Sequence, residues 1–498
     1  MVWYEHIITI FELNNKRKDG NMNIFYGIAI GVIVLNIIFS FFLIFIERKD
    51  PTTTWAWLLV LLVFPIVGFI GYLIFGQNLS RQKIFKDKII FDEKKRKSIT
   101  DQEKIALLKH SGGNKFADLQ KMNFNNSGAK YTINNSVDVY TNGEDKFKQL
   151  IEDIKNAKNY IHVEYYIFKN DFLGKKIIEE LTKKAKEGLE VRLLVDAMGS
   201  RMLTKNTLKH YIQAGGKFSL FFPGILPHVN TRINYRNHRK IVVIDGIYGY
   251  VGGFNVGKEY INRDPEFGFW RDTHTRIKGD AVDDLNERFL LDWCYASHEK
   301  ITDYNKYICE DKNVSGDVCM QIVTSGPDHK EEYIKNAYIK IINNAKKNVY
   351  LETPYFVPDA PVLEALRISA LSGVDVRIII PGKADHFFMK WAASSYIGEL
   401  LEAGVKVYSY KNGFIHAKTM VSDSGVMSIG TANMDIRSFK LNFEVNAFIY
   451  DDRIAIDGEN QFRKDMEFSE EITKEIYNNR RLLLRIEESL IRLLSPIL

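Results

Sequence analysis

Two long apolar segments stand out near the amino terminus of the chain. Residues 24–46 are interrupted only by Asn36 and Ser40, and residues 55–75 carry no charge. A helix needs about 20 apolar residues to cross the hydrocarbon core of a bilayer. Residues 47–54, which separate the two segments, are polar. The pattern predicts a transmembrane hairpin of two helices, with a cleaved signal peptide and a buried helical pair as the alternatives.

Basic residues flank this predicted hairpin on both sides. Lysine and arginine are concentrated in residues 16–18 and again in residues 81–97, whereas the basic residues of the loop at 47–54 are offset by acidic ones. Since basic flanks stay on the cytoplasmic side of a membrane, both ends of the hairpin are predicted to be cytoplasmic. We therefore expect a multi-pass protein of the cell membrane, with the rest of the chain in the cytoplasm.

The remaining sequence alternates apolar strands with amphipathic helices, and it does so twice. Residues 157–168 are echoed by residues 345–356, which places Glu164 opposite Glu352. Two further pairs of segments repeat at a similar separation, and each half reads strand, helix, strand, helix, strand. Continuous apolar strands such as residues 241–244 are typical of a sheet that is covered on both faces. The duplication predicts two similar α/β domains.

These patterns divide the chain into five segments. They are an N-terminal extension (1–23), the transmembrane hairpin (24–76), a charged linker (77–127), a first α/β domain (128–310) and a second one (311–498) that ends in an amphipathic helix.

Composition adds little to this division but excludes some classes of partner. The chain has 498 residues, 46% of them hydrophobic and 26% charged, and a formal net charge of +6. This length suits two cores rather than one. The charge is far below that of nucleic-acid packaging proteins, so no nucleic acid is expected as a partner. The three cysteines lack the spacing of a disulfide framework or of a zinc site.

A further repeat carries the candidate chemistry. Both copies fit the pattern His-x-Lys-x4-Asp-x6-Gly-x2-Asn without an insertion. In a strand, the histidine and lysine project from one face, and the aspartate projects from the other. The first copy comprises His238, Lys240, Asp245, Gly252 and Asn255, and the second comprises His416, Lys418, Asp423, Gly430 and Asn433.

This combination of side chains suits phosphoryl transfer. One imidazole can attack phosphorus while the other protonates the leaving alkoxide, and the lysines with the asparagine amides can stabilise the non-bridging oxygens. The histidine, lysine and aspartate of both copies are therefore candidate catalytic residues, and Asn255 and Asn433 are candidate substrate ligands. For Asp245 and Asp423 a structural role is favoured, because they face away from the histidines. No metal and no cofactor is expected, since the sequence has no phosphate-binding loop and no metal-binding motif.

The doubled motif resembles the phospholipase D superfamily, whose two pseudo-symmetric α/β/α sandwich domains meet at one site that holds both histidines. Within that superfamily, the paired spans, residues 51–57 and residues 492–496 resemble bacterial cardiolipin synthases. The resemblance implies transfer of a phosphatidyl group from one phosphatidylglycerol to another, which gives cardiolipin and glycerol through a phosphohistidine. It implies that His238 is the nucleophile and His416 the general acid and base. A phospholipase D-type hydrolase and a phosphatidylserine synthase-like transferase are the alternatives.

The same resemblance implies a carboxylate downstream of each motif that orients the histidine and fixes its tautomer. Glu444 lies at the family spacing after His416, and Asp272 is its counterpart by strand alignment in the first half. Glu266 stands at the literal spacing after His238. The implied partners are phosphatidylglycerol and other anionic membrane lipids, and a homo-oligomer is left open.

Overall fold

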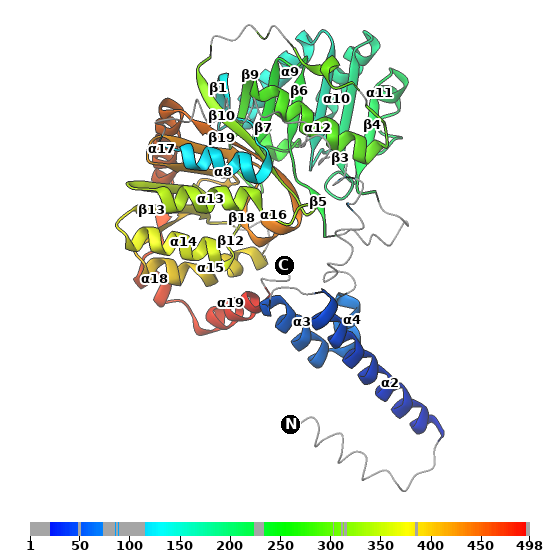
Figure 1. Ribbon diagram of the computed structural model, residues 1–498, viewed down its shortest axis with the longest axis vertical. Coiled ribbons are helices and arrows are strands. Elements are labelled where there is room, and N and C mark those ends of the chain that lie inside the picture. The colour runs from blue at the N-terminus through cyan, green and yellow to red at the C-terminus, as the bar shows by residue number, and fades with distance from the viewer. Residues whose placement is uncertain are drawn as a thin grey trace. The chain divides into compact units, whose positions relative to one another are not determined.

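The computed structural model describes residues 20–47, 51–72, 85, 88, 115–223, 234–301, 303–309, 312, 316–383 and 387–494 (Figure 1). The chain forms two compact units, one up to Ser80 and the other from Arg81 to Pro496. Most of the predicted extension, much of the predicted linker and the predicted boundary at residues 310 and 311 lie outside the described residues. The predicted domain limits therefore stay predictions.

The described part of the amino-terminal unit is helical. Its elements are α2 (Gly20–Phe42), the π-helical turn η1 (Leu43–Glu47), α3 (Pro51–Val63) and α4 (Pro65–Gly71). Within the described residues, no helix combines the length and the apolar character that a membrane crossing requires.

The second apolar segment does not form one helix, so the prediction of a continuous helix over residues 55–75 was wrong. Pro65 cannot donate a backbone hydrogen bond, and its ring clashes with the preceding turn. Phe64 accordingly leaves the helical region, with φ −127° and ψ 73°. The chain then folds back on itself. As a result, the ring centroids of Trp57 and Tyr72 are only 5.0 Å apart.

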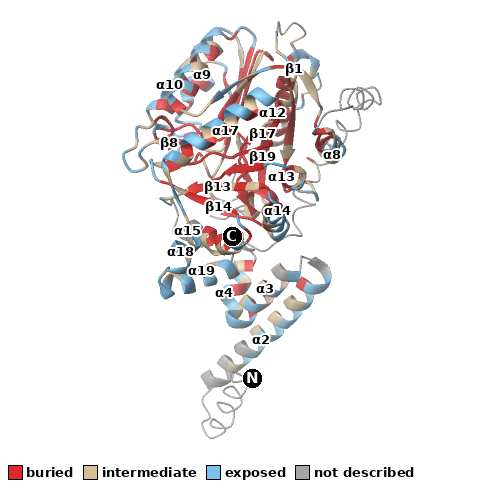
Figure 2. Ribbon diagram, turned by 90° about the vertical axis from the view of Figure 1, so that its left-hand side faces the viewer, coloured by how far each residue is buried: buried red, intermediate tan, exposed pale blue. Residues whose placement is uncertain are grey.

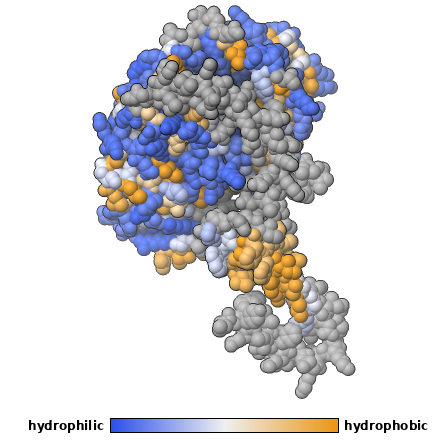
Figure 3. Space-filling view, in the orientation of Figure 1, coloured by the Kyte–Doolittle hydropathy of each residue, from blue (hydrophilic) through white to orange (hydrophobic). Residues whose placement is uncertain are grey.

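Apolar side chains cover much of the outside of these helices (Figure 3). Leu62 is 79% exposed and Trp55 is 72% exposed. Other exposed apolar residues include Ile37, Ile38, Phe41, Phe45, Ile66 and Val67. An apolar surface of this extent marks a region that contacts lipid or another protein.

The larger unit is built on a single sheet in which two sets of strands follow the same order. From the centre outwards, the first half runs β1-β9-β7-β6-β2-β3-β4, and the second runs β10-β19-β17-β16-β11-β13-β14-β20. The halves join where β1 (Thr132–Tyr140) pairs antiparallel with β10 (Val318–Ser325). The repeated order confirms the mixed α/β architecture with two similar domains.

The remaining strands of the first half are β2 (Tyr160–Tyr165), β3 (Glu190–Asp196), β4 (Lys217–Phe221), β6 (Ile241–Ile244), β7 (Tyr248–Gly252) and β9 (His274–Gly279). Those of the second half are β11 (Asn348–Glu352), β13 (Asp375–Pro381), β14 (Lys406–Tyr410), β16 (Thr419–Ser422), β17 (Val426–Gly430), β19 (Asn442–Tyr450) and β20 (Ser469–Glu471). Short strands outside this order are β5 (Arg236–Asn237), β8 (Trp270–Arg271), β12 (Phe356–Val357), β15 (Phe414–Ile415) and β18 (Met434–Asp435).

Helices cover both faces of the sheet, and the most buried residues lie in the strands between them (Figure 2). The first half contributes α9 (Gly143–Asn156), α10 (Phe172–Lys186), α11 (Lys209–Gln213), α12 (Ala281–Ser297) and the 3-10 turns η3 (Lys258–Ile261) and η4 (Asn305–Tyr307). The second half contributes α13 (Tyr333–Asn344), α14 (Ala360–Leu371), α15 (Phe387–Glu402), α16 (Ile436–Lys440), α17 (Asp452–Glu467), α18 (Lys474–Asn478) and α19 (Leu482–Leu494). Before β1, α8 (Ala117–Ser127) packs on α13 and β10.

One of the hydrophobic clusters of the larger unit is shared by the two halves. Each half has a core of its own under its outer helices, but the cluster beneath α12 and α17 draws on both. It contains Phe289 and Ile241 from the first half together with Val445 and Phe462 from the second. The relative position of the two halves is therefore fixed by burial of apolar surface as well as by the sheet.

Candidate active site

A short strand precedes each motif histidine and pairs with a strand of the opposite half. β5, just before His238, pairs in parallel with the start of β19, and β15, just before His416, pairs in parallel with β8. The backbone amide of His238 donates to the carbonyl of Phe443 (2.9 Å), and the amide of His416 donates to the carbonyl of Arg271 (2.6 Å). Each histidine is thus positioned by main chain from the other repeat.

Both histidines hydrogen-bond to a carboxylate of the opposite half. Nδ1 of His238 donates to Oε2 of Glu444 (2.9 Å), and Nδ1 of His416 donates to Oδ2 of Asp272 (2.6 Å). The sequence singled out these two carboxylates but placed each with the histidine of its own half, and that pairing was wrong. The pairing is crossed because β5 and β15 join strands of the other repeat. Glu266 is exposed on the turn before β8.

The two carboxylates are held by different local contacts. Glu444 accepts a hydrogen bond from the hydroxyl of Thr431 (2.5 Å) and another from the amide of Asn442 (3.1 Å). Asp272 accepts one from the backbone amide of Thr273 (2.7 Å). A Cβ atom at Gly253 would lie 1.9 Å from Oδ1 of Asp272, so only glycine leaves room for this carboxylate.

Burial sets the protonation of the site. Burial lowers the pKa of His238 to about 4, although the charge of Glu444 opposes this shift. Burial and the charge of Lys418 together lower the pKa of His416 to about 4. Both imidazoles are therefore neutral near pH 7. Burial also lowers the pKa of Lys240 to about 7.

Electrostatic interactions link the two motifs. The charge of Lys418 acts on His238, and the charge of Lys240 acts on His416. Burial would raise the pKa of Asp272, but the charges of Lys418 and His416 outweigh it and hold that pKa below its ordinary value. The two histidines, two lysines and two carboxylates are therefore electrostatically coupled.

The motif asparagines already have protein partners. Oδ1 of Asn255 accepts from the backbone amide of Ile167 (3.1 Å), and its Nδ2 donates to the hydroxyl of Tyr260 (3.2 Å). Nδ2 of Asn433 donates to Asp435 (3.1 Å), while its Oδ1 is buried and has no hydrogen-bond partner among the described residues. Each amide retains a second N–H for a ligand. Their role as substrate ligands stays a prediction.

The motif aspartates lie at the far ends of β6 and β16 from the histidines. The Asp245 carboxylate accepts from the backbone amides of residues 158–160, and the Asp423 carboxylate accepts from those of residues 346–348. Each carboxylate therefore anchors the start of the neighbouring strand, β2 or β11. This contact pattern fits the structural role that strand parity favours and gives neither aspartate a place beside the reacting groups.

Changing Asp423 to asparagine is expected to lower stability by about 1–3 kcal/mol near pH 7, because the NH2 group that replaces one carboxylate oxygen cannot accept a hydrogen bond from a backbone amide. Asparagine tolerates the positive φ of 53° at this position. Burial would raise the pKa of Asp423, but the three amide hydrogen bonds hold it below its ordinary value. The stabilisation is therefore present above about pH 4 and is lost as the pH falls through the folded-state pKa. Thermal unfolding at several pH values measures it. A large loss of kcat in folded D423N protein would instead indicate a chemical role.

Two aromatic residues beside the histidines escaped the sequence analysis. The ring of Tyr166 is 4.9 Å from that of His238, and the ring of Trp270 is 5.2 Å from that of His416. Lys240 also lies over the ring of Tyr166, at 5.6 Å. Both aromatics stand two positions from an acidic residue that the sequence analysis noted, and this proximity was the available signal.

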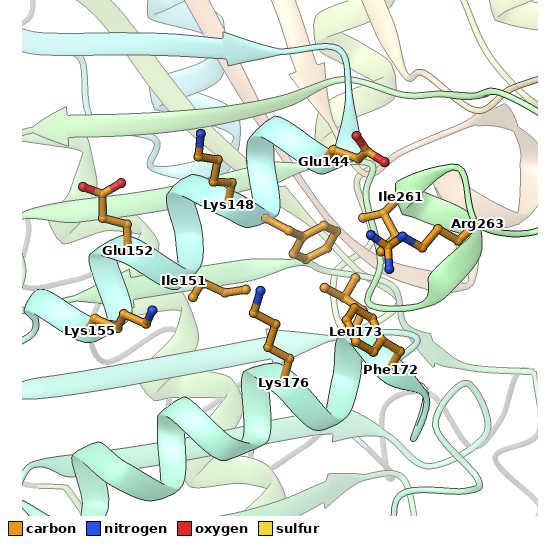
Figure 4. Close-up of a pocket in the computed structure, with 11 residues that line it drawn as sticks. Glu144, Lys148, Ile151, Glu152, Lys155, Phe172, Leu173, Lys176, Ile261 and Arg263 are labelled. Carbon is orange, nitrogen blue, oxygen red and sulfur yellow. The ribbon is translucent and has the colours of Figure 1, made fainter.

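A separate cavity of about 490 Å³ lies between α9 and α10 (Figure 4). Apolar residues such as Phe147 and Leu173 line it together with Lys148, Lys176 and Arg263. No motif residue lines this cavity. Elsewhere in the part of the chain that the structure describes, no group of three or more His, Cys, Asp or Glu side chains is arranged to hold a metal ion.

Comparison with known families agrees with this geometry. The family described as "Cardiolipin synthase, PLD-like domain" matches residues 150–293 and 338–466, and the family described as "Phospholipase_D-nuclease N-terminal" matches residues 34–77. The chain is 52% identical over 457 residues to a cardiolipin synthase of Clostridium perfringens, an alignment that covers 91% of this chain and 96% of that protein. The chain belongs to the cardiolipin synthase family. Its phospholipase D-like domains contain both copies of the motif.

Other members of the cardiolipin synthase family match over nearly their whole length. The major cardiolipin synthase of Bacillus subtilis is 52% identical over 470 residues, covering 93% of this chain and 98% of that one. A cardiolipin synthase of Staphylococcus aureus is 48% identical, covering 98% and 99%. Among solved structures, a phosphatidylserine synthase of Haemophilus influenzae aligns with a TM-score of 0.55 at 16% identity, covering 77% of this chain and 98% of that one. This structural likeness concerns the fold alone.

Proposed function

We propose that this member of the cardiolipin synthase family transfers a phosphatidyl group between two molecules of phosphatidylglycerol and releases glycerol. The observation that carries the proposal is the pair of crossed histidine–carboxylate contacts, which engage Nδ1 of both imidazoles. Nε2 of each ring is then the nitrogen available to a phosphodiester. The curated relatives with about 50% identity over nearly the full chain support the same reaction.

In the first half-reaction, neutral His238 attacks the phosphorus of the donor lipid through Nε2. The new P–N bond forms as the P–O bond to the glycerol headgroup breaks, and His416 delivers a proton to the leaving oxygen. Lys240 and Lys418 neutralise the non-bridging oxygens. Because the phosphodiester brings negative charge beside His416, it raises the fraction of that ring that is protonated.

In the second half-reaction, the terminal hydroxyl of an acceptor phosphatidylglycerol attacks the phosphohistidine. His416 accepts the hydroxyl proton as the P–N bond breaks, and cardiolipin leaves with His238 neutral again. One phosphodiester has replaced another, so removal of glycerol is sufficient to drive the exchange.

The membrane placement is part of the proposal. The exposed apolar surface of α2, α3 and α4 supports an anchor in the lipid, with the catalytic domains on the cytoplasmic side. The carboxyl-terminal helix α19 adds a second apolar face, since Leu482 is 72% exposed and Leu483 is 67% exposed. This face has the character of a helix that lies in the interface of a membrane.

Full-length protein in vesicles that contain labelled phosphatidylglycerol tests the reaction. A four-chain lipid and glycerol, formed in equal amounts, are expected on chromatographic separation. Phosphatidic acid with glycerol would instead indicate hydrolysis. Phosphatidylserine formed from a cytidine liponucleotide and serine would indicate the other transferase.

A further inference from the structure

A buried arginine lies behind each histidine–carboxylate pair. Arg239 is 1% exposed, and its Nε donates to the main-chain carbonyl of Glu444 (3.1 Å). Arg271 is 2% exposed, and its Nη1 donates to the main-chain carbonyl of Asp272 (2.6 Å). In both cases the guanidinium holds the backbone of the residue that orients a reacting histidine.

The other end of each guanidinium is fixed by a helix. Arg239 bonds to Oδ2 of Asp292 on α12 (2.5 Å), and Arg271 bonds to Oδ2 of Asp465 on α17 (2.8 Å). Both aspartates are at most 3% exposed. A planar guanidinium held at two places has little freedom to move. Each arginine therefore connects the main chain of an orienting carboxylate residue to a helix, α12 for Glu444 and α17 for Asp272.

The two arginines differ in their place in the sequence, since Arg239 follows a motif histidine and Arg271 precedes an orienting carboxylate. Ala417 occupies the position in the second motif that Arg239 occupies in the first. Phe443 stands immediately before its carboxylate, where Arg271 stands in the other half, and the guanidinium of Arg239 lies 5.1 Å from the centre of the Phe443 ring. Two different arrangements of side chains thus produce the same contact, which indicates that the site requires the contact itself.

A buried glutamate interacts electrostatically with each arginine, Glu164 with Arg239 and Glu352 with Arg271. Burial raises the pKa of Glu164 and that of Glu352 to about 8. Glu352 lies 3.4 Å from Arg271, and within the part of the chain that the structure describes each glutamate has one oxygen without a hydrogen-bond partner. The shorter side-chain contacts of the two arginines are those with Asp292 and Asp465.

We propose that Arg239 and Arg271 are positioning residues that set the direction of the two reacting imidazoles through the main chain of Glu444 and Asp272. The peptide before each carboxylate is held by the amide of a motif histidine, and the carbonyl of the carboxylate residue is held by an arginine. Loss of the second contact lets the carboxylate move relative to the ring. The identity of the reacting histidines rests on the proposed function.

Lysine substitutions test this role, with R192K as the matched control. Lysine keeps the charge but cannot make the forked contact. Arg192 is equally buried and bonds to Glu299 (3.0 Å) rather than to the site. We expect R239K and R271K to lower kcat by about 10-fold to 100-fold with little change in KM, as misplacement of catalytic groups does. R192K is expected to retain kcat even where it lowers the unfolding temperature.

The pH profile separates positioning from a general loss of stability. The orienting carboxylates raise the pKa of their histidines, so loosening them lowers it. R271K should therefore shift the alkaline limb of the kcat profile, where the general acid loses its proton, to lower pH. R239K should shift the acidic limb, where the nucleophile is protonated, to lower pH. Unmoved limbs, or effects equal to those of R192K, would overturn the proposal.

A nuclear magnetic resonance titration of labelled histidine makes the test independent of turnover. R271K is expected to lower the titration midpoint of His416 and leave that of His238 in place, and R239K is expected to do the converse. Wild-type protein that forms no cardiolipin would overturn the proposed function alone. Unchanged midpoints in both variants would overturn the positioning role alone.

Discussion

Changing His238 to alanine is expected to abolish formation of both cardiolipin and glycerol, with a loss in kcat of about 10⁶-fold, as for removal of a covalent nucleophile. No P–N bond can form without this imidazole, and Nε2 of His416 cannot serve both as acid and as nucleophile. Labelled phosphatidylglycerol mixed rapidly with wild-type protein should leave acid-labile label on the chain, and H238A should acquire none. H210A provides the control, because His210 is exposed on α11.

A donor lipid with a p-nitrophenyl leaving group assigns the two histidines. This leaving group departs without a proton, so H416A should still release p-nitrophenol in a first turnover while H238A should not. Release by H238A and none by H416A would mean that the roles are exchanged. Release by both variants would exclude a phosphohistidine mechanism.

Changing Glu444 to glutamine or Asp272 to asparagine is expected to lower kcat by about 10⁴-fold, as for loss of a carboxylate that fixes the histidine tautomer. The crossed contacts give these variants different signatures. E444Q should impair the nucleophile, so the activated leaving group should not rescue it. D272N should impair the general acid, so the activated leaving group should restore much of the first turnover.

The same pair of variants distinguishes crossed from uncrossed pairing in solution. If each carboxylate served the histidine of its own half, D272N would resist rescue and E444Q would be rescued. E266Q is the control, because Glu266 is exposed and has the literal spacing that the sequence suggests. It should retain the wild-type rate with both donors.

The repeated spacing in the sequence identifies the side chains of the candidate site but not the contacts between them. Both histidine and lysine pairs follow from the repeated spacing, and strand parity places Asp245 and Asp423 away from the reacting groups. The partner of each histidine could not be predicted in this way. It depends on parallel pairing between β5 and β19 and between β15 and β8, which are far apart in the sequence and only two residues long where they meet.

Proline chemistry explains the main error in the fold. A count of apolar residues predicts one helix over residues 55–75, but hydropathy does not register that Pro65 removes a donor and obstructs the preceding turn. The break between α3 and α4 follows from that single residue. The arginines behind the site escaped for a different reason, since an arginine within a strand is most often solvated and only tertiary packing reveals its partners.

The exchange of histidine partners means that neither repeat contains a finished reaction centre. His238 is oriented by Glu444, and His416 is oriented by Asp272. Each half therefore supplies one histidine and depends on the other half for the carboxylate that orients it. A cut between the repeats that let them separate would leave two inert fragments. Activity would return only if the fragments reassembled. Loss of the orienting carboxylate in one repeat would inactivate the histidine of the other repeat.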